Sequence, residues 1–266
     1  LFSAAKGGHT GTLDPLATGL LPLCFGEATK FSADLLDADK TYEAVVRLGI
    51  CTDTGDAEGT VIATATVDVS KDYIFRVLRQ FTGAIRQIPP MHSALKRNGR
   101  PLYELARQGI EVERESRMVT IHAIDCLSFG GDSLTLRIAC SKGTYIRVLA
   151  ADIGRALGCG AHLAGLRRTR VGDLDLGAAV TLAHLESLDE AGRASCLQPV
   201  DALLRSLPSA TLEGKAAERF RHGNPVDLPA GLSGKVRIYV DGTLIGVGEP
   251  APDGRLWPRR LVQLTF

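Results

Sequence analysis

The chain has 266 residues, of which 45% are hydrophobic and 23% are charged, a balance typical of globular proteins that bury a core. This composition excludes a disordered, collagen-like or coiled-coil chain. The 31 basic and 30 acidic residues leave a net charge of +1, which by itself favours no particular partner. No apolar run reaches the roughly 20 residues that span a bilayer, and no basic-then-apolar leader follows Leu1. We therefore expect neither a transmembrane helix nor a secretory signal.

The first elements are predicted from residue periodicity. A glycine- and threonine-rich loop covers 7–19, and the alternation over 41–50 predicts a half-buried strand. A polar loop follows at 53–59. Ser70 is placed to cap a helix over 71–81, because apolar residues recur there at helical spacing.

The remaining elements alternate between helices and β-structure. Before the predicted linker at 206–209 they are, in order, a basic proline-containing loop over 84–100, a short helix over 101–108, a hairpin of strands 118–129 and 133–141, a helix over 144–157 ended by Gly158, a short basic strand over 166–171 and an acidic helix over 181–191. After the linker come a helix over 213–221 and a hairpin of strands 236–240 and 243–247, which Asp241-Gly242 joins. The pattern predicts an α+β protein with a small β-barrel-like C-terminal domain.

Basic residues gather in two stretches of this neutral chain. Seven lysines and arginines stand against one acid over 137–170, and seven against four glutamates over 86–117. Phosphate groups are bound by local basic clusters rather than by net charge. The stretches are either a surface for a polyanion or ordinary solvated faces, and charge counting alone favours the second.

The six cysteines form no CxxC motif and have no closely spaced histidine partners. Zinc sites and thioredoxin-like centres are therefore not expected. Cys24, Cys126 and Cys140 lie among apolar residues and are interpreted as small core side chains in a reducing compartment, which we expect to be the cytoplasm.

The glycine-rich loop carries one carboxylate, Asp14, directly before Pro15. The loop lacks the Lys-Ser or Lys-Thr that ends a phosphate-binding P-loop, and it lacks the GxGxxG pattern. Proline favours an extended conformation at Asp14 and stiffens the loop. Asp14 is thus either a candidate catalytic carboxylate or an aspartate that hydrogen-bonds its own turn, and the local pattern alone favours the turn.

The segment 141–147 joins a predicted strand to a predicted helix and holds two cations. Lys142 lies near the helix start, where a cation is unfavourable unless a carboxylate or phosphate docks there. Arg147 lies one turn further, in a position to pair with Asp14 and hold that carboxylate ionised and oriented. The alternative is a surface arginine.

The acidic loop 53–59 contains Asp53, Asp56 and Glu58. An EF-hand loop needs oxygen ligands at alternating positions, where this loop has Gly55 and Ala57. The spacing argues against a calcium site and favours a solvated turn.

The string Gly8-His9-Thr10-Gly11-Thr12-Leu13-Asp14-Pro15-Leu16-Ala17-Thr18-Gly19 resembles the catalytic motif of the TruB family, the tRNA pseudouridine-55 synthases. Further stretches match the family in the same order: Lys40-Thr41-Tyr42 with the loop 53–59, residues 89–103 with Gln108-Gly109, residues 141–147, Gly158-Cys159-Gly160-Ala161-His162-Leu163, and Leu166-Arg167-Arg168. The resemblance covers about residues 7–190. It implies the pseudouridine synthase fold, with a mixed or antiparallel central sheet flanked by helices. It also implies a catalytic domain over 1–207 and a PUA-like RNA-binding domain over 208–266.

The resemblance implies that the protein isomerises uridine 55 in the T-loop of tRNA to pseudouridine. The N1–C1′ bond is cleaved, the base turns and a C5–C1′ bond forms; no redox change occurs, so we expect neither cofactor nor metal. Asp14 matches the family's catalytic aspartate, acting as nucleophile or as base at the sugar, and Arg147 matches the arginine that pairs with it. Tyr42 matches the tyrosine that packs on the target base, and Leu166 matches an apolar residue of the pocket. His9 matches the histidine that fills the space left by the flipped base.

A flipped loop nucleotide costs only a few kcal/mol, which stacking on an aromatic ring offsets. The expected partner is the T-arm of tRNA, with no membrane, no required protein partner and a monomeric enzyme. The side chains expected to hold the RNA are Lys96, Arg97, Arg100, Lys142, Arg167 and Arg168.

The family pattern also includes a strand with a Lys-Pro motif ahead of the Gly-His-Thr-Gly segment, and this sequence begins after it; we expect that strand to contribute to the catalytic core. Three other functions compete with the synthase. The chain is alternatively a non-catalytic RNA-binding or tRNA-folding module, a guide-RNA-dependent synthase, or a glycosidase that uses Asp14 with Asp34 or Asp37. No aromatic sugar platform lies near those aspartates in the sequence, which disfavours the glycosidase.

Overall fold

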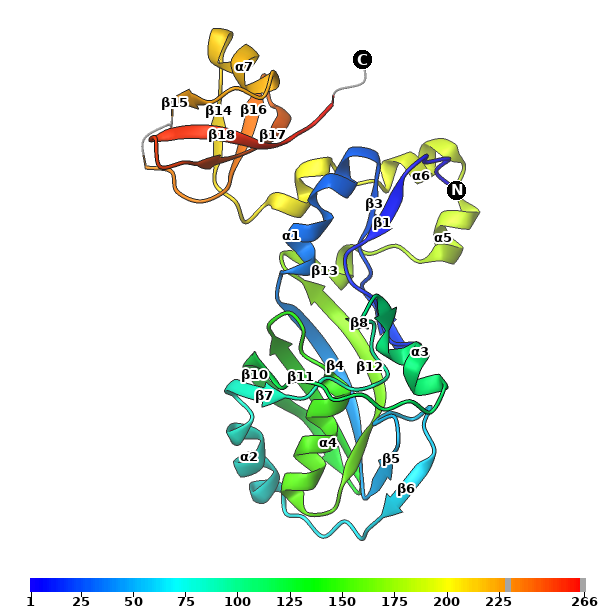
Figure 1. The fold of residues 1–266 in the computed structure, drawn as a ribbon. Coiled ribbons are helices and arrows are strands. Elements are labelled where there is room, and N and C mark those ends of the chain that lie inside the picture. Colours follow the sequence, from blue (N-terminus) through cyan, green and yellow to red (C-terminus); the bar gives the residue numbers. More distant parts are fainter. Residues whose placement is uncertain (228–230, 264–266) are drawn as a thin grey trace. The chain divides into compact units, whose positions relative to one another are not determined.

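The computed structural model describes residues 1–227 and 231–263 and contains two compact units (Figure 1). Unit 1 comprises Leu1–Gly11, Pro22–Leu36 and Ala178–Phe266, and unit 2 comprises Thr12–Leu21 and Asp37–Gly177. This division cuts the chain elsewhere than the expected boundary between 1–207 and 208–266, which stays a prediction. Within the described ranges, no helix combines the length and apolarity that a membrane crossing requires.

Unit 2 is built on a seven-stranded mixed sheet of described residues, as the α+β prediction requires. Its strands are, in spatial order, β13 (Leu174–Asp175), β12 (Ala161–Val171), β4 (Lys40–Leu48), β11 (Ser133–Cys140), β10 (Arg117–Gly130) and β7 (Gly83–Gln87), with β2 (Ala17–Gly19) parallel to β12. Two small hairpins join β5 (Ile50–Thr52) to β6 (Val61–Thr64) and β8 (Lys96–Arg97) to β9 (Arg100–Pro101). The remaining elements are α2 (Lys71–Gln80), α3 (Leu102–Arg107), α4 (Ile146–Leu157) and η2 (Leu176–Ala178), the last of which reaches into unit 1.

The hairpin of β10 and β11 confirms the predicted alternation, because alternate residues of a strand point to one face of the sheet. Leu134, Leu136, Ile138 and Cys140 are all buried in the main core. Helices α2 and α4 lie against this face and complete the core (Figure 1). The predicted capping of α2 is also confirmed, since the Ser70 hydroxyl accepts a hydrogen bond from the backbone N–H of Tyr73.

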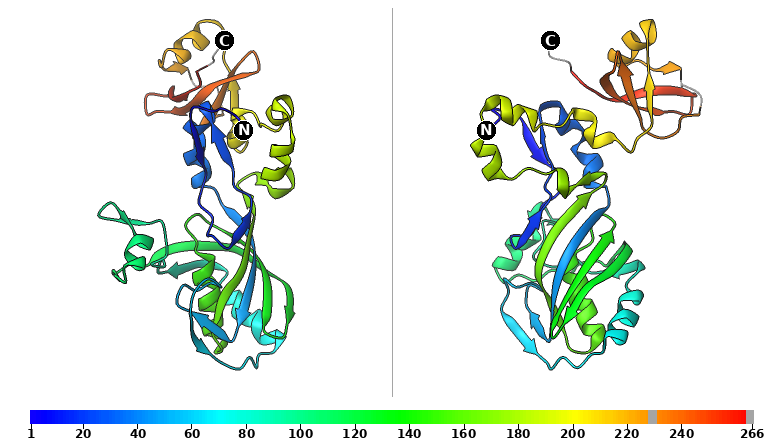
Figure 2. Two further views of the ribbon diagram at one scale, coloured as in Figure 1. Left: turned by 90° about the vertical axis from the view of Figure 1, so that its right-hand side faces the viewer. Right: turned by 180° about the vertical axis from the view of Figure 1, so that it is seen from behind.

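The opposite face, seen in the right-hand view of Figure 2, carries a row of alternating charges. Arg167 of β12, Glu43 of β4, Arg137 of β11 and Asp125 of β10 are successive cross-strand neighbours. The Arg137 guanidinium lies 3.5 Å from the Glu43 carboxylate. Opposite charges placed directly across strands stabilise a solvated sheet face modestly. We call these four residues the charge row.

Three predicted elements differ most from the structure. β7 begins at Gly83 and takes up the first part of the predicted loop 84–100, because its backbone pairs with β10. The predicted strand 166–171 is the second half of β12, which starts at Ala161. The predicted acidic helix is split into α5 (Leu182–Ser187) and α6 (Glu190–Ser195), because Leu188 is extended and Asp189 caps the start of the second helix.

Unit 1 combines three separated segments of the chain. It contains the pair β1 (Gly7–His9) and β3 (Leu23–Phe25), then η1 (Gly26–Phe31), α1 (Ser32–Leu36), α5, α6, η3 (Val200–Leu204) and α7 (Gly214–Arg221). A curled five-stranded sheet follows, with the order β14 (Ser209–Thr211), β16 (Val236–Val240), β17 (Thr243–Pro250), β18 (Arg255–Leu261) and β15 (Val226–Asp227). The predicted hairpin turn is present, with Asp241 and Gly242 both at positive φ (48° and 73°), as a two-residue turn of this type requires. Phe31 packs with Leu204, Leu244 and Val247 and so ties the N-terminal segment to the C-terminal sheet.

Candidate active site

The loop that carries Asp14 is held along one edge of the main sheet. Its β2 part pairs in parallel with β12, and the Asp14 carbonyl accepts a hydrogen bond from the N–H of Ala17 at 2.8 Å. Gly19 has φ +98°, and a Cβ at this position would lie 2.3 Å from the carbonyl oxygen of Arg168. A residue with a side chain would therefore push the loop away from β12.

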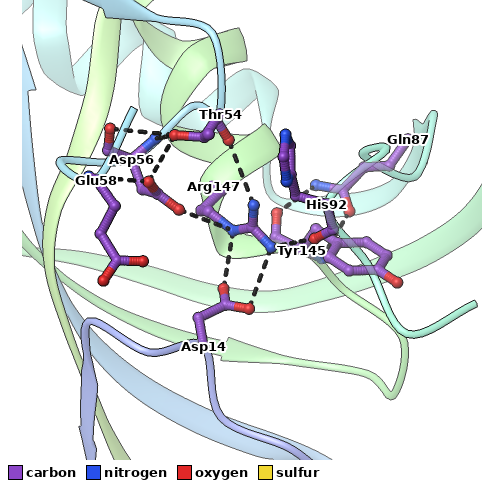
Figure 3. A network of polar contacts seen from close by, with 8 residues as sticks. All are labelled: Asp14, Thr54, Asp56, Glu58, Gln87, His92, Tyr145 and Arg147. Carbon is purple, nitrogen blue, oxygen red and sulfur yellow. Dashed lines mark hydrogen bonds and ion pairs between the residues drawn. The ribbon is translucent and has the colours of Figure 1, made fainter. Parts of the chain in front are cut away.

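Arg147 lies in the first turn of α4, is 4% exposed, and binds Asp14 through two nitrogens (Figure 3). Nε donates to Oδ2 of Asp14 at 2.8 Å, and Nη2 donates to Oδ1 at 3.1 Å. The ion pair predicted from the sequence is confirmed. Bidentate pairing fixes the plane of the carboxylate as well as its position.

The same guanidinium contacts a second, buried carboxylate. Nε of Arg147 lies 3.5 Å from Oδ2 of Asp56, a residue that is 4% exposed. Oδ1 of Asp56 accepts hydrogen bonds from the Thr54 hydroxyl at 2.6 Å and the Glu58 N–H at 3.1 Å (Figure 3). The solvated turn expected at 53–59 is therefore wrong for Asp56, because its carboxylate faces α4 and not water.

The terminal nitrogens of Arg147 also donate to backbone carbonyls. Nη2 donates to the carbonyl of His92 at 2.7 Å, and Nη1 donates to the carbonyl of Thr54 at 3.3 Å. The buried Arg147 guanidinium thus contacts two carboxylates and the backbone of two loops. Asp56 is enclosed and satisfied, whereas the side chain of Asp14 is 34% exposed. Of the two carboxylates, Asp14 is the one that a ligand can reach.

Gln87 at the end of β7 fixes the residue before α4. Its side-chain Oε1 accepts from the Tyr145 N–H at 3.0 Å, and its Nε2 donates to the Tyr145 carbonyl at 3.3 Å (Figure 3). Gln87 is buried, so this amide replaces the backbone partner that a neighbouring strand would supply. The Arg117 guanidinium lies over the Tyr145 ring, 4.9 Å from its centroid. Two elements therefore set the start of the helix that carries Arg147.

We expect the substitution Gln87→Met to destabilise the protein by about 1–3 kcal/mol, because it leaves the Tyr145 N–H without its partner. The Tyr145 carbonyl keeps its hydrogen bond from the Leu149 N–H. Urea denaturation followed by circular dichroism measures this change. The matched control is Gln80→Met at the exposed end of α2, for which we expect a change within about 0.5 kcal/mol. Equal stability of the two variants would contradict the anchoring role of Gln87.

The other predicted pocket residues lie on the two strands next to the Asp14 loop. Tyr42 is on β4 and packs against the main core; Leu166 is on β12, in the core and opposite Ala17. Burial raises the pKa of the Tyr42 hydroxyl, and the Asp14 charge acts in the same direction, whereas the Arg168 charge opposes it. His9 is exposed on β1 of unit 1, and its role beside the flipped base stays a prediction.

The predicted RNA contacts differ in their surroundings. Lys96 and Arg97 on β8 and Arg100 on β9 are exposed on a small hairpin, where Arg97 donates to the carbonyl of Glu113 at 2.6 Å. Arg167 is exposed on β12. Arg168, by contrast, is buried and bound to backbone carbonyls. The predicted phosphate contact does not hold for Arg168, because its guanidinium is enclosed in the core.

Most of the basic stretch 137–170 is neutralised locally. Lys142 pairs with Asp37 at 2.8 Å and Arg155 pairs with Asp152 at 2.6 Å. Arg137 pairs within the charge row, and Arg147 binds Asp14 and Asp56. Of the RNA contacts predicted in this stretch, Arg167 is exposed and lies outside these pairs. Most cations of this stretch therefore have carboxylate partners within the protein. This agrees with the alternative that charge counting favours, ordinary faces and not a surface for a polyanion. Asp37, one of the two aspartates considered for a glycosidase, pairs with Lys142 and not with Asp14. The side chain of the other one, Asp34, lies outside the described residues.

Sequence reasoning missed Asp56, Thr54, His92, Gln87 and Tyr145. The Asp56 position was visible as an acid in a polar loop, yet its burial depends on α4 and β12, which follow about a hundred residues later. Within residues 1–227 and 231–263, no three His, Cys, Asp or Glu side chains gather in a way that could hold a metal ion.

Solved structures share the α+β fold of this chain. A Cbf5-Nop10-Gar1 complex matches with a TM-score of 0.69 and 29% identity, covering 94% of this chain and 71% of that chain. An H/ACA RNP bound to a substrate RNA containing 2′-deoxyuridine matches with a TM-score of 0.74 and 25% identity, covering 99% of this chain and 78% of that chain.

Sequence comparison identifies the family. The TruB family pseudouridylate synthase N-terminal domain matches residues 1–146, and two TruB C-terminal domain families match residues 147–205 and 208–262. The tRNA pseudouridine synthase B of Dechloromonas aromatica (strain RCB) is 77% identical over 100% of this chain and 89% of the relative. That of Aromatoleum aromaticum (strain DSM 19018 / LMG 30748 / EbN1) is 58% identical over 98% of this chain and 85% of the relative. The chain belongs to the TruB family of pseudouridylate synthases, and the resemblance stated from the motifs is confirmed.

Proposed function

We propose that this enzyme converts uridine 55 in the T-loop of tRNA to pseudouridine, with Asp14 as its catalytic carboxylate. The proposal takes its substrate class from relatives named tRNA pseudouridine synthase B. The observation that carries the role of Asp14 is its geometry: two hydrogen bonds from the buried Arg147 orient a carboxylate whose side chain is 34% exposed. A carboxylate held in this way is oriented and accessible.

The proposed reaction needs a carboxylate that acts at the sugar and a uracil base that turns after its release. Cleavage of N1–C1′ detaches the uracil, the base turns so that C5 faces C1′, and loss of the C5 proton follows the new bond. Asp14 acts at the sugar, as the nucleophile at C1′ or as the base that takes a sugar proton. Asp56 shares the Arg147 charge, and its own hydrogen bonds with Thr54 and Glu58 keep Asp56 in place.

The target base is proposed to stack on Tyr42 beside Leu166, in a pocket bordered by β4 and β12. The Tyr42 hydroxyl, whose pKa burial raises above its ordinary value, can donate a hydrogen bond while the base turns. His9 is proposed to fill the vacated space in the RNA. Stacking of a flipped base on an aromatic ring is worth about 1–3 kcal/mol, enough to offset much of the cost of flipping.

The proposed RNA contacts are the exposed cations Lys96, Arg97, Arg100 and Arg167. Lys142 is not among them, because it pairs with Asp37 at 2.8 Å. We expect Arg167→Ala to weaken binding of a T-arm stem–loop and to lower the slope of log K against log salt by about 1, the value for one phosphate contact. Fluorescence anisotropy at several salt concentrations measures both quantities. Arg137→Ala on the same face is the control, because Arg137 is already paired with Glu43. An unchanged slope for Arg167→Ala would remove this residue from the interface.

Tritium release from T-arm RNA labelled at C5 of uridine tests the proposed reaction. We expect release from the position-55 uridine, and no release when that uridine is replaced by cytidine. Tight RNA binding without release would favour the competing function, a non-catalytic tRNA-folding module. Action as a monomer, without a protein partner and in the cytoplasm, stays a prediction.

A further inference from the structure

Arg168 is a buried arginine that the proposed chemistry does not use. It lies on β12, is 2% exposed, and is among the largest fully buried side chains. Its Nε donates to the carbonyl of Leu20 at 2.8 Å, and its Nη1 lies 3.5 Å from the carbonyl of Thr12. These two carbonyls stand at the two ends of the loop that contains Asp14, so one guanidinium bridges both ends.

The backbone of Arg168 holds the same loop. Its carbonyl accepts a hydrogen bond from the Leu20 N–H at 2.8 Å, and Gly19 is its partner in the parallel pairing of β2 with β12. A Cβ at Gly19 would lie 2.3 Å from this carbonyl oxygen, so the two backbones are in close contact. The side chain and the main chain of Arg168 therefore act on one segment, Thr12–Leu20.

Arg168 also faces the second pocket strand. It is the cross-strand neighbour of Tyr42 in the pairing of β12 with β4. The Arg168 charge lowers the pKa of Tyr42 against the larger, raising effect of burial. Burial and, after it, the Arg168 charge lower the pKa of Lys40 on the same strand. The guanidinium thus lies where the Asp14 loop, β4 and β12 meet.

We infer that Arg168 is a positioning residue, which holds the two ends of the Asp14 loop at the distance that Arg147 and Tyr42 require. Arg147 orients the carboxylate of Asp14, whereas Arg168 sets the backbone that carries it. Arg147 and Arg168 therefore have separate roles in positioning Asp14. The inference rests on the proposed function, because it assigns a consequence for the rate of that reaction.

The variants Arg168→Met and Arg168→Lys test the inference, with Arg170→Met on the exposed side of the same strand as control. Met fills most of the volume but donates no hydrogen bond, and Lys keeps the charge and reaches one carbonyl. Single-turnover tritium release separates two effects: fewer folded molecules lower the amplitude, while a misplaced loop lowers the rate constant. We expect the rate constant of Arg168→Met to fall on the order of 100-fold, that of Arg168→Lys to be intermediate, and that of Arg170→Met to be unchanged. The RNA dissociation constant is expected to stay within about threefold in all three.

Two results would overturn the inference. A lower amplitude with an unchanged rate constant would make Arg168 a purely structural residue, and weaker RNA binding with an unchanged rate constant would make it a phosphate contact. Hydrogen exchange of the peptide covering residues 12–21 provides a readout that does not depend on activity. We expect exchange at least about tenfold faster in Arg168→Met than in Arg170→Met, with α4 protected equally in both. Equal exchange in the two variants would contradict the inference, whereas an inactive unsubstituted chain would contradict only the proposed function.

Discussion

Replacing Asp14 by Asn is expected to slow pseudouridine formation on the order of 10⁴-fold while RNA binding is retained. Asparagine has the shape of aspartate and still accepts a hydrogen bond from Arg147 through its side-chain oxygen. It has neither the charge nor the basicity to attack C1′ or to take a proton. Loss of one negative charge near a phosphate backbone does not weaken binding. Tritium release and anisotropy, measured on the same preparation, give both quantities.

The matched control for this variant is Asp125→Asn, which removes an equal charge from the exposed charge row. We expect its rate to stay within about twofold of the unsubstituted chain. A rate for Asp14→Asn within tenfold of the unsubstituted chain would place the chemistry on another residue. No release from the unsubstituted chain, with RNA bound tightly, would instead identify a binding protein.

Arg147→Met is expected to affect both activity and stability. It removes the partner of two carboxylates, one of which, Asp56, is 4% exposed. Removing one member of a buried ion pair costs about 3–5 kcal/mol, because the remaining charge stays in the interior. The rate is expected to fall at least about 100-fold, since the Asp14 carboxylate loses its fixed orientation. Urea denaturation and single-turnover tritium release measure the two effects.

The double variant Arg147→Met/Asp56→Asn distinguishes the two roles of this cation. Asparagine at 56 still accepts from Thr54 and Glu58 but carries no charge, so we expect it to restore part of the stability and none of the rate. Arg137→Met is the control, because its pair with Glu43 is exposed and is worth no more than about 1 kcal/mol. If the double variant were as unstable as Arg147→Met, the buried charge of Asp56 would not be the cause.

Local signals in the sequence predicted local structure well. Ser70 before an apolar helical pattern gave the start of α2, and the alternating Leu134, Leu136 and Ile138 gave the buried face of β11. The Asp241-Gly242 pair gave the hairpin turn. The pairing of Asp14 with Arg147 was also predicted, although 133 residues separate the two. That prediction depended on a helix start at a known place and on a single carboxylate that a family motif singles out.

The residues that sequence reasoning missed have partners from distant parts of the chain. Asp56 is buried because α4 and β12 close over its loop, and nothing in the loop itself requires this. Arg168 was taken for a phosphate contact because a basic run does not distinguish an exposed side chain from an enclosed one. β7 went unseen because its pairing with β10, and not its own alternation, makes it a strand.

The interleaved composition of the two units has a consequence for how the protein is made. All of unit 2 has been synthesised once Gly177 has been added, whereas the first 11 residues and Pro22–Leu36 belong to unit 1, whose remainder begins at Ala178. Domains fold as units while the ribosome extends the chain from its N-terminus. The nascent sheet of unit 2 is therefore expected to form first and to carry the Asp14 loop with it. Phe31 is therefore expected to stay exposed to solvent until its packing partners Leu204, Leu244 and Val247 have been synthesised.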